Sequence, residues 1–230
     1  MPALRLIAWN CHHGSLSARL ADLAEHSPDI LFLQECTPGT PKEARHVFVR
    51  RVGPRKSIAL GSLNPAYRLV KLKPRASSGR AAVAAAVTGT TPFTALGIWS
   101  QGPQYVKDVL RTLKAYAGPL RSGPAVVMGD LNSGTCLHRD RSPSRAHARL
   151  IDTLAGFGLV SAYHAFHAVE HGRERHPTYR HQFKASQPWH IDFCFVPASW
   201  VAHLVGVQVI DGADWAARSD HLPLAVDLQW

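Results

Sequence analysis

The chain has 230 residues, 46% of them hydrophobic, and a formal net charge of +10. This length allows one large domain or two small ones, and the apolar content is enough for a core. No run approaches the roughly 18 apolar residues of a membrane span, and the N-terminus lacks the pattern of a secretory signal, so we expect a cytoplasmic protein. The excess of 26 Lys and Arg over 16 acids favours an anionic partner: nucleic acid, a phosphorylated metabolite or a lipid headgroup.

Four cysteines are spread along the chain, at positions 11, 36, 136 and 194. No two of them form a CxxC pair, which excludes the spacing of a zinc ribbon. Because each lies within four residues of a candidate functional position, a zinc or redox site is one interpretation. We expect instead small buried residues near strand ends in a reducing compartment.

The N-terminal segment predicts a strand, a helix and a second strand. The apolar run 3–9 ends in Asn10, a helix is expected over 18–25, and the run 30–33 ends in Gln34 and Glu35. A strand-helix-strand unit of this kind pairs its strands in parallel. Asn10 and Glu35 are therefore predicted to lie on one rim of the sheet.

The middle of the chain changes to short β-rich runs separated by Gly, Pro, Asn and Ser. This pattern favours an antiparallel meander. The predicted strands cover 46–50, 57–61, 67–72, 81–88 and 93–99. A helix with an apolar face follows over 104–117.

A buried strand over 125–128 then ends abruptly in Gly129, Asp130, Leu131 and Asn132. Asp, Asn and Gly are common turn residues, so a simple turn is one interpretation. In open α/β sheets, however, ligands bind outside the carboxyl ends of the strands. A carboxylate and an amide at such an end suit a water-activating base beside a donor to an anionic group. Gly129 is expected to let the backbone pass close to a neighbour.

The C-terminal part contains a basic loop over 137–145, a helix over 146–156 and an irregular segment over 165–187. Three strands close the chain, over 191–196, 203–210 and 222–228. Asp192 lies in the first of these strands, and the pair Asp220 and His221 precedes the last. Several carboxylates gathered in one cleft without a matching Lys would repel one another. A divalent cation resolves that repulsion, and oxygen ligands favour Mg²⁺ or Mn²⁺ over zinc.

Taken in order, these stretches resemble the endonuclease/exonuclease/phosphatase superfamily. The resemblance spans residues 8–221, and its matching stretches are Ala8-Trp9-Asn10-Cys11, Leu33-Gln34-Glu35, Met128-Gly129-Asp130-Leu131-Asn132, Pro177-Thr178-Tyr179, His190-Ile191-Asp192-Phe193 and Ser219-Asp220-His221. It implies an α/β fold, a four-layer sandwich of two packed β-sheets flanked by helices. We expect one domain over 1–230. The stretch 177–179 is expected to be an edge strand under the site.

The resemblance also implies a metal site. Glu35 would be the principal metal ligand, with Asn10 beside it, and Asp220 would complete the metal shell. The implied cofactor is Mg²⁺ or Mn²⁺.

The remaining implied roles concern water and phosphate. Asp130 would orient or deprotonate the attacking water, and Asn132 would hold a phosphate oxygen. His221 would donate to the phosphate in the transition state, with Asp192 fixing its ring. These roles suit in-line attack at phosphorus, where positioning and charge neutralisation supply most of the catalysis.

The chain departs from the family pattern at one place. Deoxyribonuclease I-like members carry a further His at the end of the strand that corresponds to 93–99, where this chain has Trp99 and Ser100. Tyr105 could supply a phosphate-facing hydroxyl instead, or could be a packing aromatic. His12 and His13, next to Asn10, are other candidates.

Three basic segments, over 71–80, 138–145 and 171–180, are candidates to grip a polyanion. Arg139 and Arg141 are the predicted substrate contacts, and solvated loop charge is the alternative. The sequence thus predicts a monomeric Mg²⁺-dependent phosphodiesterase acting on nucleic acid. The alternatives are an enzyme for a small or lipid phosphate, and a binding module that has lost catalysis.

Overall fold

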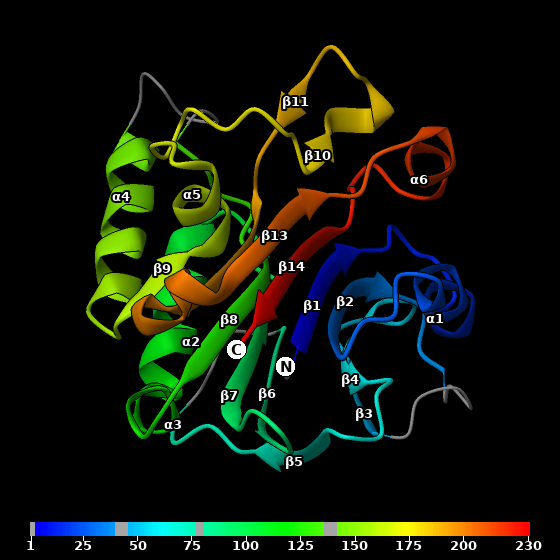
Figure 1. Cartoon of the computed structure of the whole chain (residues 1–230). Coiled ribbons are helices and arrows are strands. Elements are labelled where there is room, and N and C mark those ends of the chain that lie inside the picture. The colour runs from blue at the N-terminus through cyan, green and yellow to red at the C-terminus, as the bar shows by residue number, and fades with distance from the viewer. Residues whose placement is uncertain (1–2, 40–45, 77–80, 136–141) are drawn as a thin grey trace.

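The computed structural model describes residues 3–39, 46–76, 81–135 and 142–230. Two six-stranded mixed β-sheets pack against each other, and helices cover their outer faces (Figure 1). The predicted four-layer sandwich is therefore confirmed. Within the described residues, no helix has the length and apolarity needed to cross a bilayer.

The first sheet contains both ends of the chain. Its strand order is β13 (Leu204–Val209), β14 (Leu224–Gln229), β1 (Ala3–Asn10), β2 (Ile30–Cys36), β4 (Ser57–Ser62) and β3 (His46–Arg51). β1 and β2 pair in parallel, from Leu6 opposite Ile30 to Asn10 opposite Gln34. The predicted parallel unit is thus confirmed, and it brings Asn10 and Glu35 to one rim.

The second sheet carries the strand that ends in Asp130. Its order is β5 (Arg68–Leu72), β6 (Ala82–Thr88), β7 (Phe93–Ile98), β8 (Ala125–Asp130), β12 (Asp192–Pro197) and β9 (Leu159–Ser161). β7 and β8 pair in parallel, and α2 (Tyr105–Ala115) and α3 (Ala117–Arg121) connect them.

The prediction of a single antiparallel meander over 46–99 is wrong. β3 and β4 pair with each other in the first sheet, whereas β5, β6 and β7 form an antiparallel run in the second. Alternating hydrophobicity marks each of these strands but carries no information about which sheet a strand joins. The partition places β4 beside β2, next to Glu35.

The helices bury one apolar face each. In α1 (Leu16–Ala24), Leu16, Leu20 and Leu23 recur at helical spacing and pack on the outer face of the first sheet. On the second sheet, α2 and α4 (Ser142–Ala155) contribute Leu113 and Leu150 to a shared cluster with strands β7, β8 and β12. These contacts exclude water from the outer faces of the two sheets and fix the position of the strand ends.

Between the sheets, one aromatic ring sets the spacing of the central strands. Phe32 of β2 is fully buried, and it faces Gly97 of β7 and Gly129 of β8. A Cβ at Gly97 would lie 2.2 Å from the Phe32 ring, and one at Gly129 would lie 2.7 Å from it. Both positions therefore need glycine for this close approach, as the sequence predicted for Gly129.

The segment predicted to be irregular, 165–187, contains little regular structure. It begins in the last turn of α5 (Ala162–His167), and the strand β10 (Tyr179–Arg180) and the 3₁₀ turn η2 (His181–Phe183) follow; β10 pairs with β11 (Pro188–Trp189). In Figure 1 this hairpin projects at the end of the molecule opposite the labelled chain termini. The turn η3 (Ala198–His203) and the helix α6 (Ala213–Arg218) flank the last two strands.

Candidate active site

The two sheets meet at a group of polar residues on their strand ends. Asp130 ends β8 and stands directly opposite Asp192, the first residue of β12. Asn10, at the end of β1 in the other sheet, donates through Nδ2 to Asp130 Oδ2 at 3.0 Å. Asn10, Asp130 and Asp192 are each no more than 1% exposed. The site therefore consists of residues that only the packing of both sheets can bring together.

Three donors orient the Asp130 carboxylate. Besides Asn10, the Asn132 side chain donates to Oδ2 at 3.0 Å and the Asn132 backbone N–H donates to Oδ1 at 2.8 Å. Asn132 reaches this position with a left-handed backbone, at φ +48°, a conformation that the surrounding structure must enforce. Burial raises the pKa of Asp130 to about 7, against the lowering effect of His221.

The amide of Asn132 is already engaged. Its second Nδ2 hydrogen donates to the backbone oxygen of Ser100 at 3.0 Å. The Asn132 amide thus donates one hydrogen to Asp130 and the other to Ser100. In this structure, Asn132 therefore serves to orient the Asp130 carboxylate. A phosphate oxygen could be held by this amide only if the bond to Ser100 opened.

His221 lies against both aspartates. Its Nδ1 is 2.8 Å from Asp192 Oδ2, and its Nε2 is 3.9 Å from Asp130 Oδ2. Burial would lower the pKa of His221, but Asp192 and Asp130 raise it to about 9, so the ring is a cation at neutral pH. The Tyr179 ring packs 4.5 Å from the imidazole between centroids.

The hydroxyl groups of Thr178 and Ser219 fix the backbone of the site residues through hydrogen bonds. Thr178 Oγ1 accepts the backbone N–H groups of Ile191 and Asp192, at 3.1 and 3.0 Å. Ser219 Oγ donates to the Asn10 carbonyl at 2.7 Å, and it accepts the His221 N–H at 3.0 Å. The stretch 177–179 thus supports the site, although only Tyr179 of the three residues is in a strand.

Glu35 has a lysine partner, which corrects the expectation of carboxylates without a matching Lys. Glu35 sits at an irregularity in the pairing of β2 with β4, at φ +56°. Its Oε1 accepts from Asn10 Nδ2 at 3.3 Å, and its Oε2 accepts from Lys56 Nζ. Lys56 immediately precedes β4, so the antiparallel pairing of β4 with β2 brings it here. No local motif around Lys56 could have revealed this contact.

Asp220 approaches a different partner from the one expected. Its Oδ1 lies 3.1 Å from His12 Nδ1, and His13 Nε2 lies 3.8 Å from Glu35 Oε2. Both histidines have left-handed backbones. Asn10 thus contacts Glu35, whereas Asp220 forms its ion pair with the His12 imidazole. Within the described residues, the group of possible metal ligands that contains two carboxylates is instead Asp130, Asp192 and His221, whose ligand atoms lie within 4.8 Å of one another.

Trp99 and Ser100 occupy the place where the family pattern has a further His. Ser100 N donates to the Asp130 backbone oxygen at 2.9 Å, and its Oγ donates to the Tyr105 backbone oxygen at 2.8 Å. Tyr105 is half-buried and begins α2. Burial raises the pKa of Tyr179, and Asp220, Asp130 and Tyr105 raise it further, which places Tyr105 within electrostatic reach of the site.

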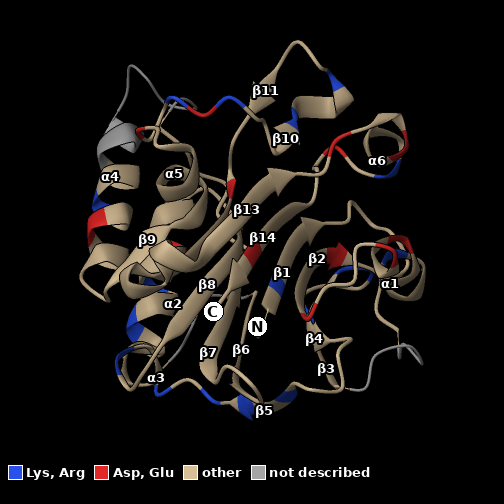
Figure 2. Cartoon of the chain, viewed as in Figure 1, with Lys and Arg blue, Asp and Glu red and all other residues tan. Residues whose placement is uncertain are grey.

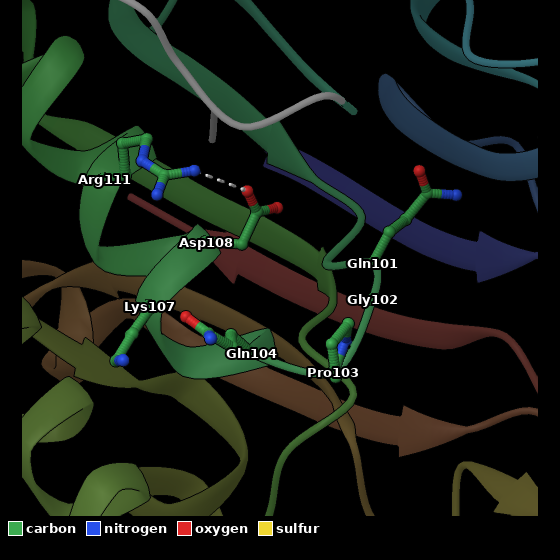
Figure 3. A pocket seen from close by; sticks show the side chains of 7 residues that line it. All are labelled: Gln101, Gly102, Pro103, Gln104, Lys107, Asp108 and Arg111. Atoms are coloured by element: carbon green, nitrogen blue, oxygen red, sulfur yellow. Dashed lines mark ion pairs between the residues drawn. The ribbon is translucent and has the colours of Figure 1, made fainter.

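A pocket that the sequence did not predict opens immediately after Ser100. Its volume is about 320 Å³, and its lining residues, shown in Figure 3, are Gln101, Gly102, Pro103, Gln104, Lys107, Asp108 and Arg111. Arg111 Nη1 lies 3.8 Å from Asp108 Oδ1. Two cations therefore line a hollow beside the site.

The predicted basic segments over 138–145 and 171–180 have different outcomes. Arg139 and Arg141 lie outside the described residues. Arg180 forms a bidentate ion pair with Asp211, at 2.7 and 2.8 Å, so its charge is neutralised. His171 packs inward. Among the described residues, Lys and Arg occur on α2, α3, α4 and β5, among other elements, rather than in one stripe (Figure 2).

The described cysteines fit the expectation of small buried residues. Cys11, Cys36 and Cys194 are free thiols that are buried. Burial raises the pKa of each of them, and that of Cys194 reaches about 12. Buried thiols with a raised pKa pack as small apolar groups. Cys136 lies outside the described residues.

Comparison with known proteins agrees with this architecture. The model of the Endonuclease/Exonuclease/phosphatase family matches residues 7–221. No curated protein matches the sequence. The fold is similar to that of a 3'-5' exonuclease from Neisseria meningitidis, at 19% identity, with a TM-score of 0.72 and coverage of 99% of this chain and 100% of that one.

Two further solved structures are similar over the same extent. An AP endonuclease from Archaeoglobus fulgidus has 18% identity and a TM-score of 0.73, with 99% and 100% of the two chains covered. A Neisseria 3' phosphatase bound to a product DNA hairpin has 19% identity and a TM-score of 0.70, with the same coverage. At these identities, the likeness shows the fold.

Proposed function

Because the chain belongs to the endonuclease/exonuclease/phosphatase family, we propose that it is a Mg²⁺- or Mn²⁺-dependent phosphodiesterase that cuts nucleic acid. One domain carries out the reaction, since both sheets contribute to one site. The observation that carries the proposal is the buried Asp130 carboxylate, oriented by Asn10 and Asn132 and facing the His221 imidazole. A fixed base opposite a fixed cationic donor is the arrangement that in-line water attack at phosphorus requires.

On the nucleophile side, Asp130 orients the attacking water and accepts its proton. The three hydrogen bonds from Asn10 and Asn132 hold the carboxylate in one orientation, so little reorganisation is needed before attack. Asn132 contributes by fixing Asp130, and it contacts the phosphate only when its bond to the Ser100 carbonyl is exchanged.

On the phosphate side, His221 donates from Nε2 to a non-bridging oxygen as negative charge develops. Asp192 accepts from Nδ1, which fixes the orientation of the ring and keeps it cationic. Thr178 holds Asp192 through two backbone N–H groups. A donor fixed before the reaction stabilises the transition state at little reorganisation cost. Tyr105 and its hydroxyl are our candidate for a further phosphate contact.

The metal would be held by Glu35, Asn10 and Asp220. These side chains offer oxygen ligands, which suit Mg²⁺ or Mn²⁺. Asp192 Oδ1 is buried and has no hydrogen-bond partner among the described residues. A buried carboxylate oxygen without a donor is consistent with a nearby cation site. When bound, such an ion polarises the phosphoryl group and offsets developing charge. Lys56 already offsets part of the Glu35 charge.

Nucleic acid is the proposed substrate for two reasons. The chain carries a net charge of +10, and Lys107 and Arg111 line a pocket beside the site. Among proteins of similar fold, one is named an AP endonuclease and another is bound to a product DNA hairpin. Arg139 and Arg141 are our candidates for contacts to the phosphate backbone.

The test is hydrolysis of a substrate panel in Mg²⁺: plasmid, single-stranded DNA, abasic duplex, DNA with a 3' phosphate, RNA and phosphoinositides. The Asp130→Asn variant, purified in parallel, is the control for a contaminating nuclease. We expect wild-type cleavage of a nucleic acid that the variant lacks. Turnover of phosphoinositides alone would support the small-phosphate alternative. No turnover of any substrate would support the binding module.

Salt dependence then distinguishes a polyanion from a small ester. A nucleic acid loses affinity with a log-log slope of about −0.9 per neutralised phosphate. Removing Arg139 and Arg141 together is expected to flatten that slope by roughly one to two units. The matched control removes Arg68, the first residue of β5, and Arg121, the last residue of α3 before β8, and should leave the slope unchanged. An equal effect of both pairs would argue against a defined contact.

A further inference from the structure

A second group of titratable side chains lies behind the active site, and the proposed reaction does not use it. We call it the histidine cluster, and it consists of His147, His164, His171, Glu174 and His190. His147 comes from α4 and His164 from α5, His171 and Glu174 lie in the segment after α5, and His190 immediately precedes Ile191. His147, His164 and His190 are buried, at 0%, 8% and 7% exposure.

Three members of the cluster have the spacing of metal ligands. The ligand atoms of His164, His171 and Glu174 all lie within 4.8 Å of one another. His164 Nε2 is 3.0 Å from Glu174 Oε1, and the His164 and His171 rings stack at 3.6 Å. Two ligand atoms bound roughly 2.0–2.1 Å from a tetrahedral Zn²⁺ lie about 3.3 Å apart. Small side-chain movements would therefore suffice for coordination.

Further hydrogen bonds hold these side chains, as they usually hold metal ligands. His164 Nδ1 is 2.7 Å from Ser161 Oγ, and Glu174 Oε1 accepts the Gly172 N–H at 2.8 Å. His190 donates its Nδ1–H to the His176 carbonyl at 2.8 Å. A second hydrogen bond of this kind selects the tautomer and aims the other ring nitrogen at the ion.

Two buried ring nitrogens have no partner within the described part of the chain. They are His190 Nε2 and His171 Nδ1. Because His190 donates from Nδ1, its Nε2 carries a lone pair, and its ring stands edge-on to His164 with 6.1 Å between centroids. A buried acceptor without a donor is costly unless an ion or a water occupies the site.

We propose that this cluster is a structural Zn²⁺ site, with His164, His171, Glu174 and His190 as its ligands. Imidazole nitrogens with one carboxylate suit Zn²⁺ better than Mg²⁺. Four protein ligands make a closed site, which is characteristic of a structural rather than a catalytic ion. The ion would fasten the segment 171–174 to α5 and to the start of β12.

The cluster also contacts both strand ends that carry the active site. His190 lies two residues before Asp192, and His147 Nδ1 is 3.0 Å from Ser133 Oγ, next to Asn132. A Cβ at Gly134 would lie 2.7 Å from the His190 carbonyl. Zinc bound here would therefore stiffen the backbone that positions Asp192 and Asn132, without itself contacting the substrate.

The test measures metal content and stability, so it is independent of activity. The full chain is stripped with a chelator, reloaded with one equivalent of Zn²⁺ or Co²⁺, and passed over a desalting column. We expect one zinc per chain by elemental analysis and an intense visible absorption of tetrahedral Co²⁺. With Zn²⁺ at about 100 times its Kd, the Tm is expected to rise by roughly 5–10 °C.

Three variants locate the ion. His171→Ala and Glu174→Gln should each lose the zinc and the cobalt absorption. His46→Ala, which removes an imidazole on β3, is the matched control and should retain both. His221→Ala disrupts the acidic group at the active site, so zinc retained by this variant shows that the ion lies elsewhere.

Either of two results would overturn the proposal: zinc content unchanged by His171→Ala and Glu174→Gln, or wild-type protein that retains no zinc. If one variant fails to fold, as judged by circular dichroism, the other decides, and the cobalt spectrum of the wild-type chain remains an independent measure. Because no activity is measured, a negative result here leaves the phosphodiesterase proposal standing.

Discussion

Replacement of Gly129 by Ala tests how the strand that carries Asp130 is packed. The added Cβ would lie 2.2 Å from the backbone oxygen of Ile98 and 2.7 Å from the Phe32 ring. Gly129 also has a φ of +132°, which residues with a side chain rarely adopt. Overpacking costs about 1–3 kcal/mol, and a sparsely populated backbone conformation costs about 1–3 kcal/mol more.

Together these terms predict a loss of about 2–6 kcal/mol in the free energy of unfolding, out of roughly 5–15 kcal/mol for a typical domain. At 2–4 °C per kcal/mol for a chain of this size, a central value of about 4 kcal/mol lowers the Tm by roughly 8–16 °C. The assay is urea unfolding followed by circular dichroism, with thermal melting as a second measure. The proposed phosphodiesterase activity should fall as well, because Asp130 is the next residue.

Three other glycines separate the two terms. At Gly97 the Cβ meets Phe32 at 2.2 Å without a positive φ, so Gly97→Ala measures the clash. Gly158 has a φ of +74° and open space around it, so Gly158→Ala measures the backbone cost, about 1–2 kcal/mol. Gly53 has neither feature, and Gly53→Ala should change stability by less than about 1 kcal/mol. If Gly129→Ala were no more destabilising than Gly53→Ala, the packing argument would be refuted.

Further predictions concern the metal, the reacting groups and the thiols. Chelation should abolish hydrolysis, and Glu35→Gln should raise the Mg²⁺ concentration needed for half-maximal rate; full activity in excess chelator would refute a metal mechanism. Asp130→Asn should lower kcat by about 10²–10⁴-fold, the usual range for loss of a general base. A near-wild-type kcat would show that another residue is the general base. In the same kinetic assay, His221→Ala should lower kcat at least as much as Asp130→Asn does. Asp192→Asn should lower kcat less, since Asp192 only orients the His221 ring; a larger loss of kcat for Asp192→Asn would contradict this order. In a Cys136→Ser background no thiol should react with Ellman's reagent until guanidinium is added, and rapid native labelling would contradict their burial. The three thiols concerned are Cys11, Cys36 and Cys194.

The local pattern of the chain was sufficient to predict most strands of the two main sheets and the polar residues at the ends of three of them. Apolar runs followed by Asn, Asp or Glu marked β1, β2 and β8 correctly, because a strand buried on both faces is continuously apolar and its end is not. The parallel pairing of β1 with β2 followed from the helix between them. From this alone Asn10 and Glu35 could be placed on one rim.

Other contacts depend on segments far apart in the chain, and only the tertiary structure decided them. β3 and β4 joined the first sheet rather than one meander, since strand partners are chosen by packing and not by periodicity. The same choice brought Lys56 to Glu35 across 21 positions. Nothing in the sequence paired His164 with His190, and folding buried them in one cluster. A sequence records which residues are apolar and how the backbone turns, whereas the partners of buried polar groups are settled when distant elements pack.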